Sequence, residues 1–275
     1  GLMERAADSQ YSQAAPPDEA LIAVAGIDTQ DDRLSMSIFG FGKNFEMFLI
    51  DRKVIYGSPA RKDVWKQLDE ALLNVYKTES GHELKIISAA IDTGGHFTQE
   101  VYQYVRERSA WGLIGIKGIG TKGKPALGKP SMVDINYVGK SLKRGVQLFP
   151  VGVDMIKTLL HNKLRDAEIG EGYIHFYKEV THDYFEELTA EREIRKQRNG
   201  YQFDRVWVKK SGVRNEALDE MVYAYAALHR LYQIYDRRTL WNQLEKRYQN
   251  QNSDSKSNRG RIRPKNVQSD YVTNW

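Results

Sequence analysis

The sequence of 275 residues contains no cysteine. Disulfide bonds, thiolate metal sites and cysteine nucleophiles are therefore excluded, while the redox compartment stays undetermined. No apolar run approaches the roughly 18–20 residues that cross a bilayer, and the N-terminus carries no secretory signal pattern. We expect no membrane partner. Hydrophobic residues still make up 41% of the chain, so a sizeable core can form.

The chain begins Gly-Leu-Met, so it has no initiator methionine at position 1. We therefore interpret it as a fragment and expect further domains outside it. Its length suits one large domain or two small ones.

Positive charge is concentrated at the C-terminal end. The net charge is +5, and residues 236–275 hold nine Lys or Arg against four acids, so this segment alone accounts for it. Such a segment suits a polyanion or an acidic partner, and its polar composition is typical of disorder. We predict a linker at 1–20, a folded domain at 21–235 and a basic, disordered tail at 236–275.

Hydrophobic periodicity predicts three strands in a meander, followed by alternating helices and strands. The predicted strands are 21–28, 34–41, 45–54, 84–92, 111–117, 146–150, 173–176 and 205–209. The predicted helices are 62–77, 97–108, 153–165, 183–196 and 215–235, with a loop at 118–130. This order predicts an α/β fold, a ribonuclease H-like mixed sheet flanked by helices on both faces.

Two of these strands end on an Asp-Thr pair. "IAVAGIDTQDD" places Asp28 at the end of the first strand, and "ISAAIDTGGHF" places Asp92 at the end of its expected parallel neighbour. Ligand sites in α/β sheets lie at the carboxyl ends of strands, so we expect these acids to lie together. Since no Lys or Arg is adjacent in sequence, a hard divalent cation such as Mg²⁺ or Mn²⁺ is the expected partner.

A third acid is expected from the closing helix, "RNEALDEMVYAYAALHRL". Asp219 is flanked by apolar Leu218 and Val222, so we expect it to face the sheet, whereas Glu216 and Glu220 suit the helix dipole or solvent. Three carboxylates on such a scaffold suit two-metal phosphodiester hydrolysis, in which one ion lowers the pKa of the attacking water. The alternative is that each Asp merely caps its strand or helix.

Four short motifs occur in the order "AGIDTQDDRL", "AIDTGGH", "IKG" and "RNEALDEMVYAYAAL". Together they resemble the nuclease domain of the large terminase subunit of tailed phages, the lambda-like GpA family, from about residue 22 to residue 231. The resemblance implies a ribonuclease H-like, metal-dependent endonuclease that cuts concatemeric double-stranded DNA during genome packaging in the host cell cytoplasm. It implies a catalytic triad of Asp28, Asp92 and Asp219 that holds two Mg²⁺ or Mn²⁺ ions.

The same resemblance implies partners beyond this chain. The full-length family protein has an N-terminal packaging ATPase, absent here, and works with the small terminase subunit and the portal. Glu220 stands where some relatives carry a cysteine, which leaves it as a fourth metal ligand or an acid behind the ligands.

Two groups of basic residues are candidates for DNA contact. The members are Lys117, Lys122, Lys124 and Lys129 around the glycine-rich loop, and Lys209, Lys210 and Arg214 before the closing helix. They would meet phosphates without reading sequence; the alternative is ordinary exposed loops. "GIGTKGKP" fits seven positions of a phosphate-binding loop, but Pro125 replaces the required Ser or Thr, which argues against ATP binding there.

Two other functional classes remain open. "DTGG" also occurs in actin-like and sugar-kinase nucleotide-binding domains, although Asp31 and Asp32 after the first strand would repel a nucleotide. The second open class is a degenerate ribonuclease H-like module that binds a partner but has no activity. His96 either lines the site or is simply solvated or packed. Asp154 either caps a helix, or lies behind the metal ligands or faces DNA.

Overall fold

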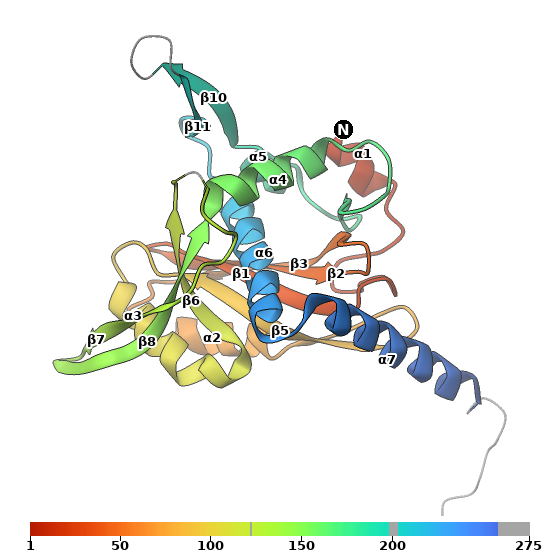
Figure 1. Ribbon diagram of the computed structural model, residues 1–275, viewed down its shortest axis with the longest axis horizontal. Coiled ribbons are helices and arrows are strands. Elements are labelled where there is room, and N and C mark those ends of the chain that lie inside the picture. The colour runs from red at the N-terminus through yellow and green to blue at the C-terminus, as the bar shows by residue number, and fades with distance from the viewer. Residues whose placement is uncertain (122, 198–202, 258–275) are drawn as a thin grey trace, which may run out of the picture.

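A computed structural model describes residues 1–121, 123–197 and 203–257, with side chains as far as residue 249 (Figure 1). A nine-stranded mixed sheet forms its centre, in the order β7-β8-β6-β5-β1-β2-β3-β9, with β4 paired to β5. Its strands are β1 (Ile22–Thr29), β2 (Arg33–Phe41), β3 (Met47–Tyr56), β4 (Val75–Lys77), β5 (Glu83–Asp92), β6 (Leu113–Ile119), β7 (Ser131–Tyr137), β8 (Lys140–Gly152) and β9 (Ile174–His175). A separate hairpin joins β10 (Glu191–Gln197) to β11 (Phe203–Lys209).

The strand directions confirm the predicted fold class. β1, β2 and β3 form an antiparallel meander, and β1, β5, β6 and β8 run parallel to one another. The protein therefore has the mixed α/β sheet of a ribonuclease H-like fold, with the meander on one side and parallel strands on the other.

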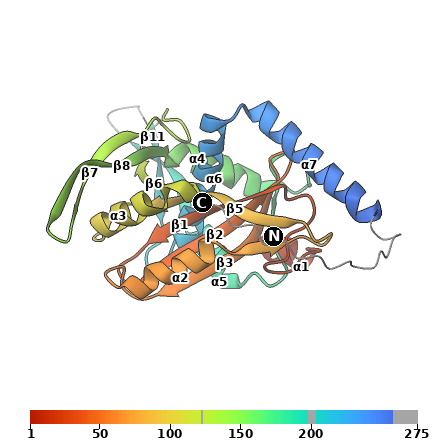
Figure 2. The same cartoon turned by 90° about the horizontal axis from the view of Figure 1, so that it is seen from below.

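Helices cover both faces of this sheet. They are α1 (Leu2–Ala7), α2 (Lys62–Leu72), α3 (Thr98–Arg108), the 3-10 turn η1 (Ser109–Trp111), α4 (Val153–Arg165), α5 (His182–Leu188), α6 (Glu216–Ile234) and α7 (Arg237–Ser257). Figures 1 and 2 show α6 lying across one face, with α2 and α3 on the other. None of the helices in the described ranges is long and apolar enough to span a bilayer.

Helix α6 lies unusually close to the sheet because β1 carries a glycine beneath it. A Cβ atom added at Gly26 would lie 1.9 Å from the carbonyl oxygen of Glu220 and 2.5 Å from the backbone nitrogen of Ala224. Every residue of β1 and β2 is buried, so these strands form the centre of the core. This contact fixes α6, and with it the acids that α6 carries, over the first strand.

Several predicted elements differ from the observed ones. The helix predicted at 62–77 ends at Leu72, and Val75–Lys77 forms β4 instead. The helix predicted at 183–196 ends at Leu188, because Glu191–Gln197 pairs with β11 as a strand. The pairing outweighs the helix-favouring composition of "EREIRKQ". The predicted strand at 146–150 is only the end of β8, and no strand is predicted where β7 lies.

Both terminal segments contain ordered structure that the sequence did not indicate. In the predicted linker, Arg5 of α1 donates to the Ile174 carbonyl over 3.1 Å. In the predicted disordered tail, α7 buries Trp241, which packs edge-on against Phe45 with ring centroids 5.9 Å apart. The structure thus places a helix in each predicted terminal segment, whereas 258–275 lie outside the described residues. The division at residues 21 and 235 stays a prediction.

Candidate metal centre

Asp28 and Asp92 lie at the ends of neighbouring parallel strands. The register pairs Ile27 of β1 with Ile91 of β5, so the two acids follow at the same level. Side chains alternate along a strand, and Gly26 faces α6. Both acids therefore point to the α6 side of the sheet. Ser88 of β5, on the same side, donates to the Ala227 carbonyl of α6 over 2.7 Å, which fits this assignment.

Asp219 of α6 belongs to the same electrostatic cluster. Burial raises the pKa of Asp28 well above its usual range, and the charges of Asp219 and Asp92 raise it further. Burial also raises the pKa of Asp219 to about 6, with Lys157 opposing the shift and Glu191 and Asp92 adding to it. The three predicted acids therefore repel one another across a poorly hydrated space.

Tyr223, one turn after Asp219 on α6, faces the same space. Burial raises the pKa of its phenol well above the usual range, followed by the charges of Asp219, Asp92 and Asp28. The charges of all three carboxylates therefore act on one phenol.

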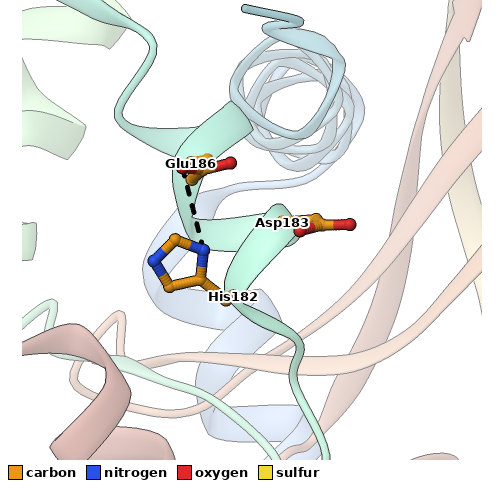
Figure 3. A group of neighbouring side chains, drawn as sticks. All are labelled: His182, Asp183 and Glu186. Carbon is orange, nitrogen blue, oxygen red and sulfur yellow. Dashed lines mark ion pairs between the residues drawn. The ribbon is translucent and has the colours of Figure 1, made fainter.

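The three acids nevertheless stand further apart than a closed ligand set. Within the described residues, only His182, Asp183 and Glu186 bring ligand atoms all within 4.8 Å of one another (Figure 3). All three are exposed on α5. Exposed acidic groups of this kind are common without an ion, so we assign no site there.

Two of the acids are held by groups close in sequence. Gln30 donates through Nε2 to Asp28 over 2.5 Å. Burial raises the pKa of Asp92, while the backbone N–H groups of Gly94 and Thr93 and the charge of Lys117 oppose that shift. A Cβ at Gly94 would lie only 3.0 Å from the Asp92 carboxylate, so glycine leaves room for the carboxylate.

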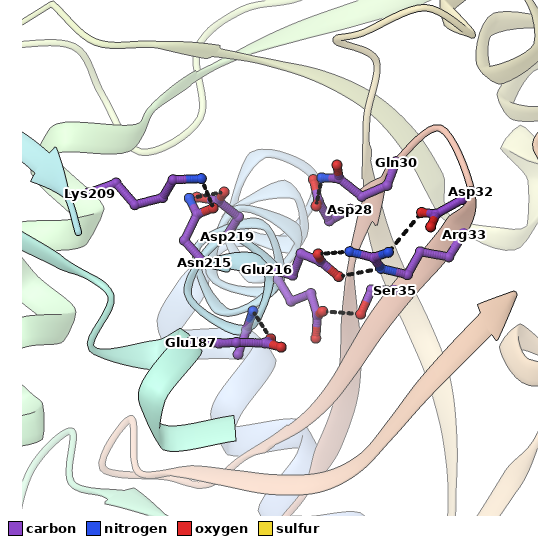
Figure 4. A network of polar contacts seen from close by, with 12 residues as sticks. Asp28, Gln30, Asp32, Arg33, Ser35, Glu187, Lys209, Asn215, Glu216 and Asp219 are labelled. Atoms are coloured by element: carbon purple, nitrogen blue, oxygen red, sulfur yellow. Dashed lines mark hydrogen bonds and ion pairs between the residues drawn. The ribbon is translucent and has the colours of Figure 1, made fainter. Parts of the chain in front are cut away.

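Asp219 is held by groups that the sequence did not reveal. Asn215 donates to its Oδ2 over 2.8 Å, and Lys157 Nζ lies 3.3 Å from its Oδ1. The same two donors also reach Glu191, at 2.7 Å from Asn215 and at 2.8 and 2.9 Å from Lys157. Figure 4 shows Asn215 between Lys209 and Asp219. α4, β10 and α6 meet here from distant parts of the chain, and no local motif marks that meeting.

Glu220 points to a different environment from Asp219. Its carboxylate is fully buried and accepts hydrogen bonds from Ser35 and Ser37 of β2. Arg52 of β3 lies 3.1 Å away as an ion-pair partner. Because these groups already occupy both oxygens, we leave Glu220 out of the proposed ligand set.

The remaining polar candidates have other partners. Glu216, expected near solvent, is buried and forms an ion pair with Arg33 (Figure 4). His96 lies 2.8 Å from Asp31, and both side chains are exposed. Asp154 lies in the first turn of α4 rather than at its cap.

Of the basic candidates, two lie beside the acids. Lys117 acts on Asp92 as described, and Lys209 Nζ lies 3.4 Å from Asn215 Oδ1. The exposed candidates are Lys117, Lys124, Lys129, Lys209, Lys210 and Arg214, whereas Lys122 lies outside the described residues. The phosphate-loop-like stretch leads into strand β7 rather than the helix such a loop requires.

The donor set fits a divalent cation. Asp28 is 4% exposed and accepts a hydrogen bond from a neutral amide, while two further carboxylates act on it. Oxygen ligands of this kind suit Mg²⁺ or Mn²⁺, which would supply the missing positive charge. Fold and site together define a class: a ribonuclease H-like α/β domain with an acidic centre at the carboxyl ends of its central parallel strands.

Comparisons with known proteins identify the family of the chain. It belongs to the family described as terminase large subunit gpA, endonuclease domain, which matches residues 1–251. It is 33% identical over 228 residues to the terminase large subunit of Escherichia phage lambda, covering 80% of this chain and 34% of that protein. It is 30% identical over 223 residues to the terminase large subunit of Enterobacteria phage P21, covering 78% and 33%.

The chain thus spans about a third of the length of these curated relatives. No solved structure matches it significantly. The family match confirms the resemblance inferred from the four motifs and extends it to the N-terminal helix and into α7.

Proposed function

We propose that this chain is a metal-dependent endodeoxyribonuclease that cuts concatemeric double-stranded viral DNA during genome packaging. The observation that carries the proposal is the convergence of Asp28, Asp92 and Asp219 from β1, β5 and α6, where burial raises the pKa of all three carboxyl groups. Membership of a terminase endonuclease family supports the reaction class.

In this proposal the three acids hold two Mg²⁺ or Mn²⁺ ions. Bound ions would lower the pKa of the attacking water and stabilise charge on the scissile phosphate. Gln30 holds Asp28, and the backbone at Gly94 holds Asp92, so these ligands are oriented before any ion arrives. The low exposure of Asp28 keeps bulk water away from the inner side of the site.

The exposed basic residues then contact the DNA backbone. Lys117 and Lys209 lie beside the acids and suit phosphates on either side of the cut. Phosphate contacts fix register without reading bases, so we expect cleavage with little sequence preference from this chain.

The remaining parts of the proposal concern the longer protein. Because the relatives are phage terminase large subunits about three times as long, we infer that the natural protein includes a packaging ATPase. We also infer that it acts with a small subunit and the portal in the host cytoplasm.

Plasmid cleavage tests the activity. Supercoiled DNA is incubated with the protein and Mn²⁺, Mg²⁺ or EDTA, beside Asp92→Ala. We expect nicking and linearisation that require metal and are lost in the variant. Absence of cleavage, or cleavage unchanged in Asp92→Ala, would reject the proposal and favour a nucleotide-binding domain or an inactive binding module.

A further inference from the structure

A buried lysine lies beside one of the proposed metal ligands. Lys157 of α4 is 9% exposed, and its ammonium lies 3.3 Å from Asp219 Oδ1. An ammonium at that distance neutralises a carboxylate that a divalent cation would otherwise use. The Lys157 ammonium and a bound divalent cation would therefore compete for Asp219 unless another group holds the ammonium back.

Glu191, the first residue of β10, supplies such a device. It is 7% exposed, and its two carboxylate oxygens lie 2.9 and 2.8 Å from Lys157 Nζ. Lys157 thus makes two short contacts to Glu191 and one longer contact to Asp219. A buried ion pair of this kind is stable only where both charges are well satisfied.

Asn215 joins the same pair of acids from the other side. Its Nδ2 donates to Glu191 over 2.7 Å and to Asp219 over 2.8 Å. Glu191 therefore anchors both groups that touch Asp219, although no hydrogen bond joins the two acids directly. We propose that Glu191 is a positioning residue that holds the Lys157 ammonium away from Asp219, so that Asp219 stays available to a divalent cation. This inference rests on the proposed metal-dependent function.

Calorimetric titration with Mn²⁺ tests the idea without DNA. Glu191→Gln keeps the shape but loses the charge, so Lys157 is expected to move fully to Asp219 and Mn²⁺ binding to weaken by about tenfold, the scale typical of groups that orient metal ligands. Glu193→Gln, on the same strand and the same side two residues later, is the matched control and should bind Mn²⁺ as the native protein does.

The double variant Lys157→Met, Glu191→Gln separates this role from others. It removes the competing ammonium together with the carboxylate charge that pairs with it, so Mn²⁺ affinity should return to within about threefold of native. Persistent weak binding would overturn the inference, because Glu191 would then be a ligand itself or Lys157 would be needed to orient Asp219. If Glu191→Gln alone does not fold, the double variant decides between these results.

Failure of this inference and failure of the proposed function differ in the native protein. A native protein that neither binds Mn²⁺ nor cleaves DNA rejects both. Native cleavage together with unchanged Mn²⁺ binding in Glu191→Gln rejects only the positioning role.

Discussion

Asp219 is the acid whose ionisation links its neighbours to the proposed activity. Burial raises its pKa to about 6, and the opposing charge of Lys157 limits that shift. Between the usual aspartate pKa and about 6, the metal-free folded protein binds a proton that the unfolded chain has released. The stability contributed by this group is therefore present at low pH and is lost as pH rises through about 6.

Metal binding should have the opposite pH dependence. A cation needs ionised Asp219, so this acid alone should raise Mn²⁺ affinity roughly tenfold between pH 5 and pH 7. Asp28, whose pKa is also raised, should add to the increase. Titration calorimetry from pH 5 to pH 8 measures this directly. An affinity that is flat across this range in the native protein would show that Asp219 does not bind the ion.

At this scale the sequence predicted Asp28, Asp92 and Asp219 because strand ends and an apolar helix face leave a local signature. It could not predict Lys157 or Glu191. A lysine in an amphipathic helix looks the same in sequence whether it meets solvent or a carboxylate brought from another element.

Helix α6 connects the residue scale to the element scale, since it carries Asp219 and rests on Gly26. Gly26→Ala would place a methyl group against the α6 backbone. We expect a loss of roughly 1–3 kcal/mol of stability or more, together with reduced cleavage because Asp219 would move away from Asp28. Thermal unfolding and plasmid nicking measure the two effects.

Gly118→Ala is the matched control for that change. Gly118 is also in a strand, β6, but a Cβ there would meet only the Val153 side chain, at 3.6 Å. Equal stability of Gly26→Ala and Gly118→Ala would contradict the close packing of α6 on β1.

A buried ion-pair network also holds α6 in place. Arg52 of β3 pairs with Glu187 of α5 at 2.5 Å and with Glu220 of α6 at 3.1 Å. Arg52→Met should cost roughly 3–5 kcal/mol, because Glu220 would stay buried without its cation. Arg61→Met removes an exposed pair with Asp63 and should cost less than about 1 kcal/mol. Urea denaturation compares the two, and similar losses would refute the network.

Two predictions of secondary structure from the sequence pattern differ from the observed elements. "EREIRKQ" has helix-forming composition, yet its backbone pairs with β11 as a strand. The segment after Arg237 is polar enough to suggest disorder, but Trp241 and Arg237 both pack on Phe45 and tie α7 to the body. In both cases a contact between distant segments outweighs local preference.

For the molecule as a whole, placement of positive charge matters more than its total. Lys209 ends β11 of the β10–β11 hairpin, which projects from the body in Figure 1, and Lys210 follows it. Lys209 reaches the acidic site through Asn215. If both lysines contact phosphates, Lys209→Ala with Lys210→Ala should lower the slope of log affinity against log salt by about 2. Binding should weaken equally for unrelated DNA sequences.

Fluorescence anisotropy with labelled duplexes in EDTA, at several salt concentrations, measures that slope without cleavage. Lys43→Ala with Lys163→Ala removes the same amount of charge from the β2–β3 turn and from α4, and should change the slope less. If both pairs change the slope equally, net charge and not the position of the lysines governs binding.

The central claim is that Asp28, Asp92 and Asp219 hold divalent metal. The most direct measurement is a crystal structure with Mn²⁺, in which anomalous scattering locates the ion. Our account predicts anomalous density among these three carboxylates. Density only at His182, Asp183 and Glu186, or none at saturating Mn²⁺, would contradict it.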